Sequence, residues 1–474
     1  MATAKQSDPL HDSSFPSKEE TARVSLVSNV KNFGATGDGK TDDTEAINHA
    51  IKDGDGLLVF PKGSYRITKP LEIVLAKTGS YGIAGSLGTA TIVMDGPGPA
   101  FRLIGNHGGT GDPGSVKPGV WKNERMPQIR EIAIEGVHPE ADGIELTETM
   151  QAIIDGVMIR NAKHGIHLVK RNRNVLIVNC HIYHNRGAGI FLDGLNLHQI
   201  NIATSHISYN RLGGIRIERS EVRNLQITGN DIEYNNAPRS FPNLTTEPTA
   251  EIWIDTTADG ASVNEVTIAS NTIQATESKG GCNIRIVEKH DGSRPPGLIA
   301  ITGNIIGSQE NNVHLTNCYG VTITGNSIYS CGNRNLLIED SSMITVGSNH
   351  FRRHTEKYGT GVRFSNSRDC TITGCGFFEE APEGQKSGAS LLELANCQRI
   401  AITGCTFTNG LPHGINAKDC HNVLITGCTL AETREKPLEK AAINFAGKGS
   451  GNSITSSSVQ GKTNAERSAG LKIK

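Results

Sequence analysis

The stretch that decides the fold is "VTITGNSIYS", residues 321–330. Closely related copies begin at other positions along the chain: "LQITGNDIEY" at 225, "VTIASNTIQA" at 266, "IAITGNIIGS" at 299, "IAITGCTFTN" at 400 and "VLITGCTLAE" at 423. Self-similarity of this kind is the sequence sign of a repeat architecture, in which each copy forms one unit of a stacked structure. The chain is therefore expected to repeat one structural unit many times.

A second phrase recurs beside the first, as in "HGIHLVK" at 164, "GGIRIER" at 213 and "TGVRFSN" at 360. The first apolar residues of its clear copies are Ile144, Ile166, Ile190, Ile215, Ile252, Ile284, Val313, Val362 and Ile415, with weaker copies at Leu336 and Leu392. Most successive copies are 22 to 30 residues apart. Apolar and variable residues alternate within each copy, which predicts a strand with one buried and one exposed face.

These repeats define the fold class. Leucine-rich repeats have a similar period but need an L-x-x-L-x-L frame that is absent here, and a propeller blade needs about 40 residues or more. The remaining architecture is an all-β, right-handed parallel β-helix with three strands in each coil of about 22 residues. We expect residues 28–460 to form this single domain.

The Gly-Asn dipeptide predicts a tight turn with left-handed backbone, which Asn tolerates better than other non-glycine residues. Stacked coils would place equivalent residues in an internal ladder: Val157, Cys180, Ser205, Asn230, Asn271, Asn304, Asn326, Asn349, Cys375, Cys405 and Cys428. We interpret the cysteines as free buried thiols, because no C-x2-C pair indicates a zinc site. Reduced thiols fit a cytosolic protein.

The ends of the domain have their own features. "KTDDTEAINHAI" predicts a capping helix at about residues 41–53, with Ala46, Ile47, Ala50 and Ile51 on one side. Residues 1–27 and 461–474 are expected to be tails. Segments 105–128, 235–250 and 288–297 are expected to be long, lid-like loops.

Composition excludes several partners. The formal net charge of −1, from 47 basic and 48 acidic residues, argues against nucleic acid and anionic membranes. No segment approaches the ~20 apolar residues of a membrane span. The first twenty residues lack the apolar core of a signal peptide, so the chain as written is expected to be cytoplasmic, whereas a trimmed chain would be secreted or periplasmic. A homo-oligomer is compatible with the sequence.

At its N-terminal end the chain resembles a known family. "FGATGDGKTDDTEAINHAI" followed by "LLVFPKGSYRIT" is similar to the opening of the pectate-lyase-like β-helix superfamily, which includes pectate lyase 3, glycoside hydrolase 28-like proteins and phage tailspikes. The resemblance implies a carbohydrate substrate. Asp38, Asp42 and Asp43 match its signature, and we interpret them as cap and turn residues. The Asn-Thr-Asp, Gly-His-Gly and Arg-Ile-Lys motifs of polygalacturonases are absent, so the reaction type does not transfer.

The exposed positions of the repeated "GIxLx" strands form two columns on one sheet. The second column brings together three acids from successive coils: Asp193, Glu218 and Asp255. Neighbouring strands lie ~4.8 Å apart, so adjacent acids would be about 5 Å and the outer two about 10 Å apart. Carboxyl groups at such separations serve retaining and inverting glycosidases respectively, with one group protonated as the general acid. We expect these three residues to be catalytic.

Residues around the acids predict substrate contacts. Trp253 and Phe191 offer flat surfaces for a sugar ring, and Arg216 and Arg285 can bind hydroxyls or a uronate carboxylate. The expected substrate-binding set is Trp253, Phe191, Arg216, Arg285, His167, Glu251 and Trp121, with Arg102 on the same sheet. His107, His290 and Arg294 lie in the long loops that border this face. The six histidines at 164, 167, 181, 184, 198 and 206 are interpreted as surface or turn residues, not as a metal site.

The function expected from these residues is glycoside hydrolysis of a polysaccharide or oligosaccharide without a cofactor. A first alternative is a polysaccharide lyase, in which Asp193, Glu218 and Asp255 hold Ca²⁺ and Arg285 or Arg216 removes the proton. A second alternative is a non-catalytic glycan-binding or tailspike-like protein. A third interpretation of the same residues is a cross-strand salt lattice with Arg216 between acidic neighbours.

Overall fold

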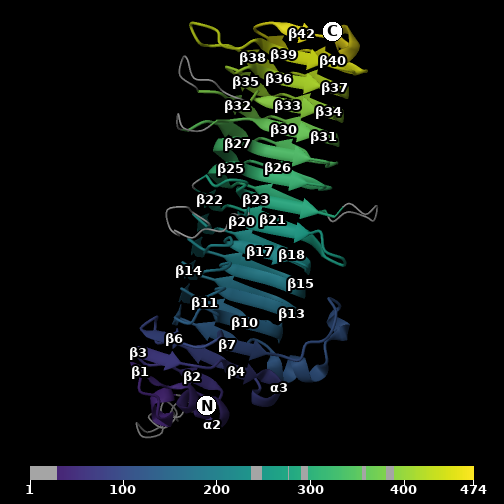
Figure 1. Cartoon of the computed structure of the whole chain (residues 1–474). Helices are drawn as coiled ribbons and strands as arrows, with labels where there is room; N and C mark the ends of the chain where they lie inside the picture. Colours follow the sequence, from purple (N-terminus) through teal and green to yellow (C-terminus); the bar gives the residue numbers. More distant parts are fainter. Residues whose placement is uncertain (1–28, 236–247, 276, 290–296, 355–358, 381–388) are drawn as a thin grey trace, which may run out of the picture.

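The alternating apolar positions stack from coil to coil along the whole chain. The computed structural model describes residues 29–235, 248–275, 277–289, 297–354, 359–380 and 389–474. Parallel strands run from β1 (Asp38–Asp42) to β43 (Leu471–Ile473), and each pairs with strands of the coils on either side. Figure 1 shows the result as one elongated stack that begins at the N-terminal helix and ends at the C-terminus. The predicted parallel β-helix is confirmed.

The register of the central coils follows the repeated phrase. The strands are β13 (Ile166–Val178), β15 (Ile190–Ala203), β17 (Ile215–Glu218), β20 (Ala250–Thr256) and β23 (Cys282–Glu288). Ile166 pairs with Ile190, Ile190 with Ile215, and the column continues through Ile252 and Ile284. All five side chains are completely buried. Burial of each such side chain stabilises the fold by roughly 1.5–3 kcal/mol, so register is fixed by the core.

The "TGN" phrase forms the turn between β26 (Val321–Thr324) and β27 (Ser327–Glu339). The left-handed residue of this turn is Gly325, with φ of 67°, and not Asn326. The equivalent residues in four other coils also have positive φ: Gly229, Ser270, Gly303 and Ser348. The expectation that Asn takes the left-handed conformation is therefore wrong. The residue before it turns the chain, and this turn points the Asn side chain inward.

The predicted internal ladder is present. The Asn230 amide donates to Asn271 Oδ1 at 3.0 Å, and Asn271 donates in the same way to Asn304. The series continues through Asn326 and Asn349 at 2.9 Å per step. It is preceded by Ser205 and Cys180 and followed by the buried thiols of Cys375, Cys405 and Cys428. Each inward amide thus satisfies the next, as a buried polar group requires.

A second corner of the coil carries ladders that were not predicted. Asn185 donates to Asn210 at 2.8 Å, and Asn210 donates to Asn235 at 2.9 Å. In later coils an equivalent series runs through Asn283, Asn312, Asn335 and Thr360. The sequence does carry a signal for them: the first three residues end a repeated I-x-x-N phrase, and the later asparagines directly precede the first apolar residue of the second repeated phrase.

The N-terminal end is closed by α2 (Thr44–Asp53), close to the predicted helix at 41–53. Its buried residues are Thr44, Ile47, Ala50 and Ile51, and Ala46 packs partly buried against the same core. Asp43 accepts bonds from the backbone N–H groups of residues 36 and 37, and Asp38 accepts from those of residues 40 and 41. The aspartates therefore fix turns beside the helix, as expected.

At the other end the coils continue further than predicted. β42 (Thr463–Ala465) and β43 pair with β39 (Ala441–Ala446) and β40 (Asn452–Thr455). Residues 461–474 therefore belong to the β-helix and are not a tail. The expected N-terminal tail at 1–27 lies outside the described residues.

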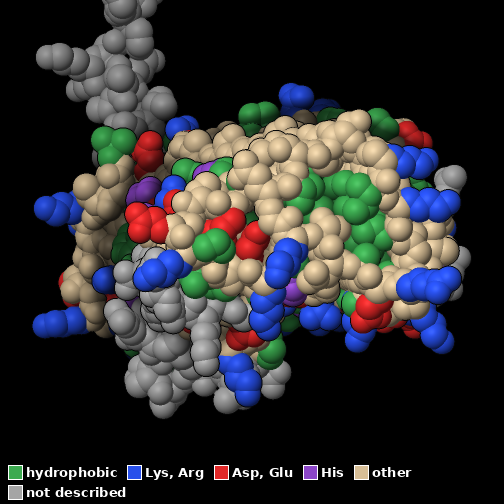
Figure 2. Space-filling view, turned by 90° about the horizontal axis from the view of Figure 1, so that it is seen from above, with side chains coloured by type: hydrophobic (Ala, Val, Ile, Leu, Met, Phe, Trp, Pro, Cys, Tyr) green, Lys and Arg blue, Asp and Glu red, His purple; other side chains and the backbone are tan. Residues whose placement is uncertain are grey.

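Seen from above, the molecule shows apolar side chains together with Lys, Arg, Asp and Glu (Figure 2).

All ten cysteines are buried and free, as the thiol interpretation expected. Burial raises the pKa of the Cys180 thiol to about 11 and that of Cys282 to about 12, so both are unreactive as nucleophiles. Within the described part of the chain, no helix is long and apolar enough to cross a membrane.

The ladder gives a direct stability prediction. Asn304→Ala removes the acceptor of Asn271 and the donor to Asn326 inside the core. Each buried group left unpaired costs about 1–3 kcal/mol, so the free energy of unfolding in urea should fall by at least ~2 kcal/mol. Asn416→Ala is the matched control, because Asn416 accepts from Asn444 on the outer face, where water can replace it. Its loss should stay below ~1 kcal/mol, and equal losses for the two variants would contradict the ladder's structural role.

Candidate functional site

The three predicted acids lie side by side on the outer face of one sheet. Asp193 on β15 pairs with Glu218 on β17, and Glu218 pairs with Asp255 on β20. The first column is also in register, from Arg102 and Glu145 through His167 to Arg285. The alternation within each strand and the register between coils therefore bring these residues together on one face, as the sequence predicted.

The first two acids are bridged by an arginine that the sequence analysis missed. Arg219 donates through Nη1 to Glu218 Oε2 at 3.2 Å, and its Nη2 binds Asp193 Oδ1. His167 Nε2 lies 3.2 Å from the second oxygen of Asp193. Arg219 ends the strand in a left-handed conformation, with φ of 52°, so strand alternation did not assign its side chain to this face.

The central acid has a second cation on its own strand. Arg216 Nε donates to Glu218 at 2.5 Å, and the Arg216 guanidinium lies 5.2 Å from the centre of the Trp253 ring. This contact is a cation–π interaction across adjacent coils. Arg216 therefore covers Trp253, which corrects the expectation of an open sugar platform there. Part of the salt lattice is present, although Arg219 bridges the acids and Arg216 does not.

Phe191 is not an open platform either. It is 8% exposed, and its ring stacks on His167 with centroids 5.4 Å apart and also contacts His164. Burial lowers the pKa of His164 to about 3 and raises that of neighbouring Asp142. His164 lies in the turn between β12 (Met158–Arg160) and β13, one of the two predicted placements, but it is a buried neutral histidine and not a surface residue.

The third acid has a different environment. Asp255 accepts hydrogen bonds from the backbone N–H and the hydroxyl of Thr257, at 2.8 and 2.6 Å. No described guanidinium or ammonium group forms an ion pair with it within 4 Å. On the next strand Arg285 donates to Thr316 and to the His314 carbonyl, and burial lowers its pKa. Asp255 is thus the member of the acid column that contacts no cation of the described residues directly.

The prediction that Glu251 binds substrate is wrong. It is 1% exposed and faces the interior, where its carboxyl group accepts the Asn235 backbone N–H at 3.0 Å and the Asn235 side-chain amide. Burial raises the pKa of Glu251 well above its usual range. The residue takes the acceptor place of the next asparagine in the second ladder, so it is structural.

The predicted loop residues differ in burial and in their contacts. Trp121 lies in the π turn Val120–Glu124 and is 38% exposed, but no contact joins it to the acid column. His107 is buried near Arg171 and Arg173, which together with burial lower its pKa to about 4. His290 and Arg294 lie outside the described residues, as does most of the predicted loops at 235–250 and 288–297.

The acid column does not form a metal site. Across the described ranges, no group of three or more His, Cys, Asp or Glu side chains is arranged to hold a metal ion. Arg219 contacts both Asp193 and Glu218 on the outer face, where a cation would have to bind. The residues present therefore do not fit Ca²⁺ held by Asp193, Glu218 and Asp255.

Profile comparisons agree with this architecture. A rhamnogalacturonase A/epimerase, pectate lyase-like profile matches residues 27–86, and a right-handed β-helix profile matches residues 120–284. A third profile, for the periplasmic copper-binding protein NosD, matches residues 242–390. The fold class is thus a right-handed parallel β-helix. Within that class, residues 27–86 are similar to the pectate lyase-like rhamnogalacturonase and epimerase proteins.

Individual relatives match over short segments. Alginate lyase 7 of Azotobacter vinelandii is 40% identical over 74 residues, which cover 14% of this chain and 9% of the relative. Mannuronan C5-epimerase AlgE3 of the same organism is 29% identical over 219 residues, or 34% of this chain and 12% of the relative. The chain therefore spans only a small part of the length of these relatives.

A solved structure shows the fold over most of the chain. The pre-mature gene product 12 of bacteriophage phi29 has a TM-score of 0.52 and covers 93% of this chain and 64% of its own. Sequence identity is 12%, so the likeness concerns the fold alone.

The corrected position of Glu251 predicts a pH dependence of stability. Because its pKa is raised in the folded protein, the unfolded chain loses this proton first as pH rises above about 4.5, and stability then falls. Glu251→Gln keeps an acceptor for Asn235 without a titrating proton. Urea unfolding at pH 5 and pH 8 should show a smaller decline for this variant than for the wild type. Equal declines would contradict a buried protonated Glu251, and Glu251→Ala should be less stable at both values.

Proposed function

We propose that the protein is a glycoside hydrolase that cleaves a uronate-containing polysaccharide on the outer face of β15, β17 and β20. Similarity of the N-terminal segment to rhamnogalacturonase and epimerase proteins supports the substrate class. The names of the matching proteins refer to rhamnogalacturonase, alginate and mannuronan, which points to acidic polysaccharides.

The observation that carries the proposal is the pairing of Glu218 with Asp255 on adjacent strands. Adjacent strands are ~4.8 Å apart, which matches the separation of about 5–5.5 Å between the two carboxyl groups of retaining glycosidases. In that mechanism one carboxylate attacks the sugar carbon, and the other group protonates the leaving oxygen and later activates water.

The surroundings of the two acids support a division of these roles. Arg216 and Arg219 hold the Glu218 carboxylate in a fixed position between them, so Glu218 is the nucleophile. Asp255 contacts no guanidinium directly and is bonded only by Thr257 among the described residues, so it transfers the proton. Asp193 acts through Arg219, which it orients, and is a positioning residue.

The arginines also define the substrate. Arg216, Arg219 and Arg285 lie on the same face as the acids, and guanidinium groups recognise carboxylates through paired, charge-assisted hydrogen bonds. A uronate next to the scissile bond would meet these groups. In the lyase alternative, Arg216 or Arg285 would remove the proton beside the uronate carboxyl group in its neutral form, and burial lowers the pKa of Arg285 in that direction.

Variants of the acid pair test the proposal. Glu218→Gln and Asp255→Asn should each lower kcat at least a hundredfold on the polysaccharide that the wild type cleaves, because a positioned acid or nucleophile contributes about that much or more. The assay is release of reducing ends from a panel that includes polygalacturonate, alginate and rhamnogalacturonan. Glu233→Gln, on another sheet of the same coil stack, is the control and should retain full activity.

The assay also separates the alternatives. A lyase would produce unsaturated uronides, which absorb ultraviolet light, in step with the reducing ends. A glycan-binding protein would retain a polysaccharide without shortening it. Unchanged turnover in either acid variant would remove that residue from the reaction, and ultraviolet-absorbing products would replace the hydrolase by the lyase.

A further inference from the structure

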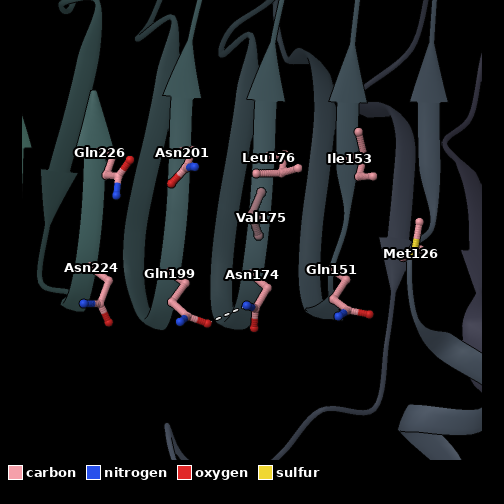
Figure 3. Close-up of a pocket in the computed structure, with 10 residues that line it drawn as sticks. All are labelled: Met126, Gln151, Ile153, Asn174, Val175, Leu176, Gln199, Asn201, Asn224 and Gln226. Carbon is pink, nitrogen blue, oxygen red and sulfur yellow. Dashed lines mark hydrogen bonds between the residues drawn. The ribbon is translucent and has the colours of Figure 1, made fainter. Parts of the chain in front are cut away.

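A groove of about 540 Å³ lies on a different sheet from the acid column. Figure 3 shows its side chains in two rows across neighbouring coils. The residues of the first row are Gln151, Asn174, Gln199 and Asn224, and those of the second are Ile153, Leu176, Asn201 and Gln226, with Met126 at one end.

The first row occupies a turn that repeats in every central coil. Strand pairing places Asn174 next to Gln199, and Gln199 next to Asn224. All four residues of this row are left-handed, with φ between 53° and 65°. The same turn in the following coils is formed by Glu265, Leu298, Gly320 and Met343. Neutral amides therefore fill this column in the successive coils of the groove, and a further amide in the same column, Asn422, lies near the C-terminus.

Two of these amides are not explained by the turn itself. Glycine and asparagine suit the left-handed conformation, whereas other side chains are strained in it by roughly 1 kcal/mol. Gln151 and Gln199 accept this cost, and their side chains carry the amide one carbon further from the backbone than asparagine does (Figure 3). Asn174 donates to Gln199, which aligns two neighbouring amides along the coil axis. Leu298 and Met343 accept the same cost in later coils, so the groove is distinguished by the run of amides in successive coils and not by the strain.

The second row changes character along the groove. Ile153 and Leu176 are apolar, and Leu176 is 37% exposed, whereas Asn201 and Gln226 in the next two coils are amides. Met126 adds a further exposed apolar side chain at the end that Ile153 occupies. The groove therefore offers C–H surface at one end and hydrogen-bonding groups along its whole length.

No charged side chain lines this groove among the described residues. An anionic polymer would require Lys or Arg there, and an extended peptide would require a free sheet edge. The strands beneath the groove have no free edge, because each pairs with a coil on both sides. Amides both donate and accept hydrogen bonds, as sugar hydroxyls do, and apolar side chains suit the C–H faces of a sugar ring.

We propose that this groove binds an uncharged oligosaccharide segment that runs along the coil axis, with its hydroxyls on the amide row and its C–H faces on Leu176 and Ile153. One amide per coil gives a repeat of ~4.8 Å, which suits a polymer with a hydroxyl-bearing unit at each step. The site is separate from the acid column and does not depend on the proposed hydrolysis. The groove would bind either a neutral segment of a longer polysaccharide or a separate neutral glycan.

Affinity electrophoresis of the full chain tests the site. The gels contain one neutral polysaccharide each (dextran, a β-1,3-glucan, a galactan, a mannan or a xylan), and polygalacturonate serves as the charged comparison. The variant Gln151→Gly/Gln199→Gly removes both amides, while glycine suits the left-handed turn, so its thermal unfolding midpoint should not fall. Leu298→Gly is the matched control, because it makes the same change in the same column outside the groove.

We expect wild type and Leu298→Gly to be retarded equally by at least one neutral polysaccharide, and the double variant to bind it at least tenfold more weakly. Retardation that persists in the double variant, or that polygalacturonate alone produces, would overturn the proposal. So would a lack of retardation by every neutral polymer, or self-association in sedimentation that the double variant abolishes. Glu218→Gln should bind as the wild type does, which separates this site from the failure of the proposed hydrolysis.

Discussion

The central coils of this molecule depend on the in-register stacking of inward amides at the turns. A turn needs a left-handed residue, and the next side chain must then enter the core at the corner of the coil. Asparagine satisfies that position because its amide donates to one coil and accepts from the other. An out-of-register coil would leave both groups unpaired inside the core, at a cost of several kcal/mol. The ladder therefore links the positions of outer-face residues that are far apart in sequence.

Much of the fold could be predicted because two periods constrain it. Alternation within a strand predicts which face is buried, and the repeat length predicts which residues of successive coils are neighbours. The column that contains Asp193, Glu218 and Asp255 follows from these two periods. The detail of the turn could not be predicted in this way. "Gly-Asn" contains two residues that both tolerate positive φ, and the sequence does not say which one turns the chain; in the structure Gly325 turns it and Asn326 forms the bond.

The site was less predictable, for a physical reason. Strand alternation predicts the face toward which each Cβ atom points. It does not predict which residues a long side chain then contacts. Arg216 was placed correctly but covers Trp253, and Phe191 packs under His167. Arg219 and Glu251 lie where strands end or begin, and alternation does not hold there. The ion pairs of Arg219 with Asp193 and Glu218 depend both on the conformation of a long side chain and on a position at a strand end. Strand alternation predicts neither.

The two sheets of one coil stack carry opposite chemistry, an acid and arginine face on one and a neutral amide groove on the other. The acid column requires that the chain returns to register after the long interval between β19 (Asp231–Glu233) and β20. A disulfide tests this most directly. Residues 216 and 253 pair across that interval, and parallel neighbours lie within the Cα range of a disulfide. Arg216→Cys/Trp253→Cys should cross-link under mild oxidation, detected by peptide mass spectrometry, while Arg216→Cys/Asp255→Cys should not. Cross-linking of the second pair alone, or of neither pair, would contradict the stacking on which the account rests.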